Sequence, residues 1–269
     1  MKIACIGDNC IDYYDETEQA FPGGNPVNAA VYLRRLGQDA SYIGAAGDDA
    51  YGRLLLRELR GKGIDVSRVR VCPGHTAVSH VTMRNGDRIF GAYDEGVMAS
   101  FRPNAEEIAF ACAHDLVVTA LWGHAEDALA EIRSRGVPTA FDAADRPFDP
   151  AAQTALPHAS VFFFSDDAST EDALREMLKT LHAGGPEVVV ATRGAKGSLA
   201  FDGRTYCRQG VVPCEVVDTM GAGDSYIAGF LAAWLFGDTL QDCMRAGAEN
   251  AAVTIGYRGA WETAGEEER

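Results

Sequence analysis

The most chemically suggestive segment is Asp-Thr-Met-Gly-Ala-Gly-Asp at positions 218–224, followed by an apolar run to Phe236. Its glycines let the backbone turn tightly and bring several N–H groups close to a ligand. A helix predicted over 224–236, directly after them, would point its free N–H groups and its dipole at the same place. Such an arrangement binds phosphate. The carboxylate of Asp224, in the first turn of that helix, is placed to accept a proton from an attacking hydroxyl.

A simpler reading of Asp224 stays open, because a single Asp at the start of a helix commonly serves only as its cap. The two glycines and the second carboxylate, Asp218, favour a phosphate site over a cap. The segment is not a P-loop, because the chain contains no G-x-x-x-x-G-K-[ST]. A dinucleotide-dependent dehydrogenase is disfavoured as well, since Gly-Asp-Asn-Cys at 7–10 does not supply the G-x-G-x-x-G fingerprint after the first strand.

Two more glycine-rich segments lie beside predicted elements. In Gly-Gly-Asn-Pro-Val-Asn at 23–28 a turn opens a helix, and the Asn28 carboxamide with the exposed peptide groups suits a polyhydroxy ligand. An ordinary turn and N-cap would explain this segment equally well. The segment Thr-Arg-Gly-Ala-Lys-Gly-Ser at 192–198 follows a strand, and α/β proteins bind ligands at the carboxyl ends of parallel strands. A plain strand-to-strand turn is the alternative there.

The elements that must position these segments alternate along most of the chain. Their apolar patterns predict strands at 3–7, 41–46, 116–120, 139–142, 161–164 and 188–192, and helices at 26–36, 52–59, 104–112, 124–135, 169–183, 224–236 and 239–255. This alternation predicts a parallel sheet with helices on both faces. An antiparallel hairpin is predicted over 199–212, around Asp202-Gly203. Segments of β character at about 9–22 and 72–100, the second with an Asn85-Gly86 turn, are candidates for a small lid sheet.

Composition excludes several other classes of protein. The 24 Lys and Arg residues against 39 Asp and Glu give a net charge of -15, which disfavours binding to nucleic acid or anionic lipid. The seven cysteines include no C-x-x-C pair, so a zinc knuckle or a disulfide framework is disfavoured and free thiols are expected. No apolar stretch reaches the roughly 18 residues of a membrane span, and no secretion signal is recognised, so a cytoplasmic location is expected.

Taken in order, these segments resemble the PfkB (ribokinase-like) family of carbohydrate kinases. The D-T-x-G-A-G-D and G-G-N-x-x-N segments carry the resemblance, together with Gly-Asp-Asp-Ala-Tyr-Gly at 47–52, and it extends from Gly7 to about Trp261. It implies a single ribokinase-like domain over 1–269, with a three-layer α/β/α fold, a mostly parallel central sheet and a small β lid. It also implies a small-molecule sugar substrate, ATP with Mg²⁺, and a homodimer as one arrangement seen among relatives with small lids.

The resemblance assigns roles to individual residues. Asp224 would be the catalytic base, and the backbone of Gly221, Ala222 and Gly223 would form the anion hole, which holds the transferring phosphate. Residues that match sugar ligands are Asp12, Gly24 and Asn28, and those that match the nucleotide site are Thr192, Gly194, Gly197 and Asn250. A monovalent cation such as K⁺ would be held by Asp218, Met220 and carbonyls near Thr254, Tyr257 and Gly259.

One departure from the family pattern concerns magnesium. The usual N-x-x-E motif, which orders magnesium-bound water, corresponds here to Ser-Asp-Asp-Ala at 165–168, which lacks both residues. Asp166, Asp167 and Glu171 are candidate substitutes, and no protein ligand of Mg²⁺ is assigned. The ion is expected to arrive with ATP, because phosphoryl transfer needs its charge compensated.

Four further segments, at 7–12, 90–99, 121–127 and 259–261, resemble the fructoselysine 6-kinase subgroup of that family. This resemblance implies a fructosamine substrate, in which an amine joins the sugar to an amino acid. Candidate contacts for the substrate are Arg88, Tyr93, Glu95, Trp122 and His124, while Glu126 is interpreted as a helix cap. The alternatives are a kinase for another sugar, a nucleoside or a hydroxymethylpyrimidine, and a sugar-binding protein without catalysis.

Overall fold

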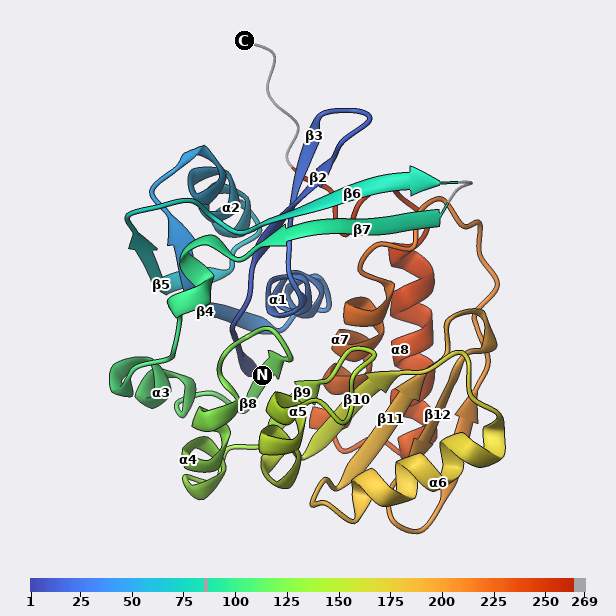
Figure 1. Ribbon diagram of the computed structural model, residues 1–269. Coiled ribbons are helices and arrows are strands. Elements are labelled where there is room, and N and C mark those ends of the chain that lie inside the picture. The colour runs from blue at the N-terminus through green and yellow to red at the C-terminus, as the bar shows by residue number, and fades with distance from the viewer. Residues whose placement is uncertain (85–86, 264–269) are drawn as a thin grey trace.

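The computed structural model describes residues 1–84 and 87–263, except for the side chains of residues 83–90 (Figure 1). Its main sheet has nine strands in the order β13-β12-β11-β10-β9-β8-β1-β4-β5. These strands are β1 Lys2–Ile6, β4 Asp39–Gly47, β5 Asp65–Cys72, β8 Leu116–Ala120, β9 Thr139–Asp142, β10 Val161–Ser165, β11 Val188–Thr192, β12 Ser198–Phe201 and β13 Tyr206–Gln209. All neighbouring strands from β5 to β11 pair parallel, while β12 and β13 pair antiparallel at one edge.

Helices cover both faces of this sheet, so the predicted three-layer α/β/α architecture is confirmed. The helices are α1 Asn25–Arg35, α2 Ala50–Gly61, α3 Ala105–Ala111, α4 Leu129–Ser134, α5 Pro150–Ala155, α6 Glu171–His182, α7 Ala222–Leu235 and α8 Leu240–Thr254. Alternate residues of β1 point to opposite faces, which follows from the two-residue period of a strand. Ile3 and Cys5 join one apolar cluster, while Ala4 and Ile6 join the other.

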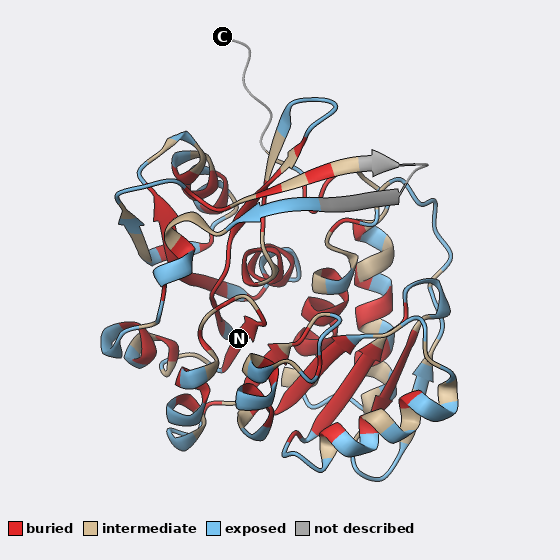
Figure 2. Cartoon of the chain, viewed as in Figure 1, coloured by how far each residue is buried: buried red, intermediate tan, exposed pale blue. Residues whose placement is uncertain are grey.

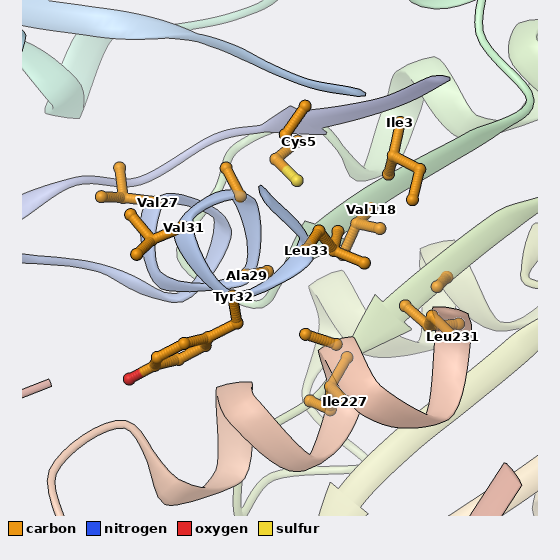
Figure 3. Close-up of a cluster of buried hydrophobic side chains, with 14 of the residues drawn as sticks. Ile3, Cys5, Val27, Ala29, Val31, Tyr32, Leu33, Val118, Ile227 and Leu231 are labelled. Atoms are coloured by element: carbon orange, nitrogen blue, oxygen red, sulfur yellow. The ribbon is translucent and has the colours of Figure 1, made fainter. Parts of the chain in front are cut away.

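The first apolar cluster surrounds α1 and α7 (Figure 3). Val27 and Leu33 of α1 and Ile227 and Leu231 of α7 pack there against β1 and β8. Because α7 is apolar on nearly all sides, it can only be an interior helix. Its residues 225–233 are all buried between the sheet and α8. Figure 2 shows the same distribution, with buried residues filling the central strands and α1.

The segments of β character form a second, four-stranded sheet in the order β3-β2-β6-β7. Its strands are β2 Cys10–Tyr14, β3 Gln19–Gly23, β6 Val78–Arg84 and β7 Asp87–Asp94. Figure 1 shows this sheet at the top of the view, apart from strands β8 to β12. We call it the small sheet. The predicted Asn85-Gly86 turn lies outside the described residues, but the flanking strands β6 and β7 pair antiparallel, as a hairpin requires.

Several predicted boundaries were wrong. Helix α7 begins at Ala222, inside the Gly-Ala-Gly run, because Gly221 adopts a left-handed φ of 72° and serves as its N-cap. The helix predicted over 124–135 is a 3-10 turn, Glu126–Ala128, followed by α4, since His124 has a φ of 52° that no helix accepts. Strand β5 and helix α5 were not predicted as such. Strand β5 is a charged edge strand. Helix α5 begins at an Asp149 cap and lacks an apolar period.

Among the described residues, none of the helices has the length and apolar character needed to cross a membrane. All seven cysteines are free thiols.

Candidate active site

The predicted phosphate segment meets the carboxyl end of the central strands near the start of α7. Asp8 follows β1, and Asp142 is the last residue of β9. The loops after β1 and β8 touch at two glycines, since a Cβ on Gly7 would lie 2.5 Å from Cα of Gly123. This close approach brings the strand ends and the start of α7 to one place, which is where α/β folds bind ligands.

Asp224 is held in place by a chain of two hydrogen bonds. Its Oδ2 accepts a bond of 2.7 Å from Nδ2 of Asn28, in the first turn of α1. The Oδ1 of Asn28 accepts in turn a bond of 2.9 Å from Nε1 of Trp261. The indole therefore fixes which end of the Asn28 amide faces Asp224. One oxygen of the carboxylate, Oδ2, is engaged in this way.

The two glycines before Asp224, Gly221 and Gly223, differ in whether the fold itself requires them. A Cβ on Gly221 would lie 2.1 Å from the hydroxyl of Tyr32, and its φ of 72° is left-handed, so the fold itself needs glycine. At Gly223 the Cβ would have no described neighbour within 4 Å. No side chain of the described residues caps the start of α7. The N–H of Ala222 donates to the carbonyl oxygen of Thr219 at 3.2 Å, so the N–H groups left for an anion among the described residues are those of Gly221, Gly223 and Asp224.

Four carboxylates gather around this point, and no ion pair of the described residues includes Asp8, Asp142 or Asp224. Burial raises the pKa of Asp224 well above its usual range, and the charges of Asp142, Asp8 and Asp12 raise it further, against the hydrogen bond from Asn28. Burial likewise raises the pKa of Asp8 to about 7 and that of Asp142 to about 6. A general base with a raised pKa is a better proton acceptor near neutral pH.

The predicted nucleotide loop has one open glycine and one structural glycine. Thr192 ends β11, and the 3-10 turn Gly194–Lys196 follows it. A Cβ on Gly194 would have no described neighbour within 4 Å, whereas one on Gly197 would lie 2.1 Å from the carbonyl oxygen of Gln209. Gly197 is therefore explained by packing against β13, and Gly194 leaves room for a ligand.

Asn250 is buried between α7 and α8, with both ends of its amide engaged. Nδ2 donates to the carbonyl oxygen of Ser225 at 2.7 Å, and Oδ1 accepts from the guanidinium of Arg35, also at 2.7 Å. The same guanidinium contacts Oγ1 of Thr254 and the hydroxyl of Tyr257. These contacts connect α1, α7 and α8, so a role for Asn250 beside adenine stays a prediction.

The residues suggested for a monovalent cation do lie together. Asp218 accepts hydrogen bonds from the backbone N–H of Met220 at 2.9 Å and of Gly259 at 2.8 Å. Its carboxylate therefore connects the segment before α7 with the segment after α8. Thr254 ends α8, and Tyr257 follows it, with its N–H directed to the carbonyl oxygen of Thr254 at 3.5 Å.

Asp166, Asp167 and Glu171, the candidate substitutes for the N-x-x-E motif, differ in the hydrogen bonds and ion pairs that their carboxylates already form. Oδ1 of Asp166 accepts from the N–H groups of Ala168 and Ser169, and Glu171 is paired with Arg175 at 2.9 Å. Asp167 is exposed. In the described part of the chain, no group of three or more His, Cys, Asp or Glu side chains could hold a metal ion.

The predicted sugar ligands surround the loop before α1. Gly24 is the N-cap of α1, with a φ of 105°. Asp12, in β2, lies directly against the neighbouring backbone, because a Cβ on Gly23 would be 2.5 Å from its Oδ2. Asp12 thus approaches from the small sheet, while Asn28 approaches from α1.

The residues suggested to contact the amino acid portion of the substrate come from the small sheet and from the loop after β8. Glu95, after β7, and His124, after β8, form a pair of 3.2 Å between Oε2 and Nε2. Tyr93 of β7 is 41% exposed. Trp122 packs against the second apolar cluster, which favours its reading as a core residue. Arg88 belongs to β7, but its side chain lies outside the described residues.

Comparison with known proteins decides the family. The sequence pattern described as "pfkB family carbohydrate kinase" matches residues 2–266. The chain belongs to the pfkB family of carbohydrate kinases. The resemblance of its signature segments to this family is confirmed, and the chain is an enzyme of the sugar kinase class.

Individual pfkB proteins are similar over nearly their whole length. The fructoselysine 6-kinase of Shigella flexneri is 45% identical over 259 residues, which cover 96% of this chain and 99% of that protein. The fructosamine kinase of Bacillus subtilis (strain 168) is 35% identical over 265 residues, which cover 97% and 93%. Arabidopsis thaliana ribokinase, solved with ribose and ATP, superposes with a TM-score of 0.82 at 20% identity, covering 96% of this chain and 93% of that one. This last likeness concerns the fold.

Four residues at the site of this pfkB chain were missed by the sequence analysis. Asp8, Asn25, Asp142 and Trp261 lie around Asp224 and Asn28, and Asn25 donates to Asp142 with 2.6 Å between Nδ2 and Oδ2. Asp142 could have been predicted, because it ends β9 and ligands bind at the carboxyl ends of parallel strands. Asn25 lies within the G-G-N-x-x-N segment itself. Nothing in the sequence indicates that Trp261 reaches Asn28.

The first prediction concerns the base. We expect Asp224→Asn to lower kcat by about 10²–10⁴-fold, because a carboxamide keeps the hydrogen bond to Asn28 but is a very poor proton acceptor. Steady-state kinetics should show much smaller changes in KM for sugar and ATP. Asp242→Asn is the matched control, since Asp242 occupies the same position of α8, three residues after its N-cap. A near wild-type kcat for folded Asp224→Asn would place the base elsewhere.

The second prediction concerns the cost of the buried carboxylates. Below pH 7 the folded state holds a proton on Asp8 that the unfolded state, with a pKa of about 3.9, releases. The wild-type protein should therefore lose stability as pH rises through 7. We expect Asp8→Asn to raise the free energy of unfolding at pH 8 by up to about 4 kcal/mol, and the gain to shrink to about 1.5 kcal/mol at pH 5 and to vanish near pH 4.

Denaturant unfolding without ligands measures this difference at pH 8, 6.5 and 5. Asp145→Asn is the control, because Asp145 is exposed and should give no gain at any pH. An Asp8→Asn protein that is no more stable than wild type at pH 8 would contradict the prediction.

Proposed function

We propose that the protein transfers a phosphoryl group from ATP to the 6-hydroxyl of fructoselysine, giving fructoselysine 6-phosphate and ADP. The observation that carries this proposal is 45% identity to a fructoselysine 6-kinase over 96% of the chain and 99% of the relative. The 35% identity to a fructosamine kinase supports the same class of substrate. The acidic site is compatible with it, since a fructosamine carries a protonatable amine.

In the proposed reaction Asp224 accepts the proton of the sugar hydroxyl as the bond to phosphorus forms. Asn28 holds the carboxylate in position through its 2.7 Å hydrogen bond, and Trp261 holds Asn28. The N–H groups at 221–223 would donate to the oxygens of the transferring group, where negative charge must be stabilised. Asp12, Gly24 and Asn28 would contact the sugar hydroxyls.

We assign the nucleotide to the loop from Thr192 to Gly197. The open space at Gly194 and the uncapped start of α7 fit a ligand with phosphates. Bound Mg²⁺ would neutralise charge on the phosphates. Asp167 is the exposed carboxylate nearest in sequence to the absent N-x-x-E motif, and we propose it as the residue that orders the ion's water. A cytoplasmic location is part of the proposal, since ATP is supplied there.

Two further parts of the proposal concern a cation and a dimer. We propose a monovalent cation such as K⁺ beside Asp218 and Met220, near the carbonyl groups of Thr254, Tyr257 and Gly259. The two hydrogen bonds that Asp218 accepts support this, because they bring the two segments together. We also propose a homodimer through the small sheet, in which β3 and β7 are edge strands able to pair with a second copy.

The substrate proposal predicts a preference that kinetics can measure. The kcat/KM for fructoselysine should exceed that for free fructose and ribose by at least about tenfold, because only the fructosamine carries the groups that the rest of the site would bind. ADP release measures the rates, and NMR of the product locates the phosphate. Asp224→Asn serves as the blank. A preference for a free sugar would overturn the fructosamine assignment and leave the kinase class intact.

The small sheet is proposed as a lid that closes over the sugar and excludes water. We expect peptides from β2 and β3 and from residues 91–95 to gain protection from hydrogen exchange when fructoselysine and a non-hydrolysable ATP analogue are added. Peptides from α6, on the far side of the main sheet from α1, are the control. Unchanged exchange in both parts of the small sheet would contradict closure.

A further inference from the structure

Asp8 is a buried carboxylate that the proposed reaction does not use. Its side chain is 5% exposed, and its Oδ2 accepts a hydrogen bond of 3.2 Å from the backbone N–H of Asn25. Its Oδ1 is buried and has no hydrogen-bond partner among the described residues. A buried polar atom without a partner is costly, and in a native protein it commonly indicates a missing ligand.

A second carboxylate lies on the other side of Asn25. Asp142 accepts the Asn25 side chain with 2.6 Å between Nδ2 and Oδ2. The charge of Asp142 acts on Asp8, where it adds to burial in raising the pKa of the Asp8 carboxyl. Asp8 and Asp142 follow β1 and β9, so both stand at the ligand-binding edge of the sheet.

A structural role accounts for only part of this arrangement. Because Gly24 offers no side chain as N-cap of α1, Asp8 replaces it by accepting the N–H of Asn25. That role needs one oxygen of Asp8 and does not need Asp142. It leaves two carboxylates that both bond Asn25 and form no ion pair among the described residues, and a bound positive charge would stabilise them.

The small sheet adds an aromatic side chain to this place. Tyr93 of β7 is in register with Ser79 of β6, which is in register with Asp12 of β2, so the Tyr93 and Asp12 side chains share one face of the small sheet. The charge of Asp8 adds to burial in raising the pKa of Tyr93. Glu95, the other acid from this side, is already paired with His124 at 3.2 Å. Asp8 is the acid with a buried oxygen, Oδ1, that has no hydrogen-bond partner among the described residues.

We propose that Asp8 and Asp142 bind the protonated secondary amine that joins the sugar to the amino acid, with Tyr93 covering it from the small sheet. This inference rests on the proposed fructosamine substrate. Carboxylates form short, charge-assisted hydrogen bonds with an ammonium group, and an aromatic ring over the cation adds to the attraction. Free fructose carries a neutral hydroxyl at the same carbon, so this pair of acids would distinguish the two sugars.

The experiment compares fructoselysine with an isostere in which an ether oxygen replaces the linking nitrogen. The wild-type kcat/KM should favour the amine by at least about tenfold, since a hydrogen bond to a charged group is worth about that much. In Asp142→Asn, and in Asp8→Asn, this ratio should fall toward one. Asp145→Asn removes an exposed charge three residues away and should leave the ratio unchanged.

The possible outcomes separate this inference from the proposed function. If the wild-type protein phosphorylates neither the amine nor the ether, the fructosamine proposal fails. If it phosphorylates both, but the variants lower both equally, the two carboxylates only position Asn25 and the inference is overturned. An unchanged ratio in both variants overturns it as well. If neither variant folds, the wild-type ratio decides, because a ratio near one excludes recognition of the ammonium.

Discussion

The site depends on where helix α7 begins. This helix is buried along residues 225–233, whereas its first turn is open, with Gly223 exposed. Gly221 starts it in a left-handed conformation against the Tyr32 hydroxyl, and no side chain of the described residues caps it. The unsatisfied N–H groups and Asp224 therefore face the same space, where a phosphoryl group supplies the missing acceptors.

The orientation of Asp224 depends on residues that are far apart in the sequence. Asn28 of α1 and Trp261 after α8 form a chain of hydrogen bonds that ends on the carboxylate. Arg35, at the other end of α1, connects the same helix to Asn250 of α8. The packing of α1 on α7 and α8 thus sets the orientation of the base, Asp224. Small changes in that packing would move its carboxylate.

At Asp8, Asp142 and Asp224, stability and function make opposite demands on the carboxylates. Each has a pKa raised chiefly by removal from water, so each makes the ligand-free fold less stable above neutral pH. A protein selected for stability alone would not keep three such groups together. They are explained if the occupied site carries positive charge, and a trade-off of this kind is common where a site is built for a ligand.

The sequence by itself determined the α/β/α architecture and the segments that carry chemistry. Apolar strands such as β8, β9 and β11 were predicted at their observed bounds, because buried parallel strands are short continuous apolar runs between polar turns. The D-T-x-G-A-G-D segment could be assigned to phosphate because glycine and a helix start are local features. Edge strand β5 and short helix α5 lack such a local signal, and so they were missed.

Only the tertiary structure decided which residues meet. Asn25 and Asp142 are 117 positions apart and Asn28 and Trp261 are 233 apart, and no pattern along the chain relates them. The structure also separated glycines that look alike in the sequence, since Gly197 and Gly221 are required by packing while Gly194 and Gly223 face open space. Such contacts arise from the order of strands in the sheet, which depends on long-range pairing and not on the residues' own preferences.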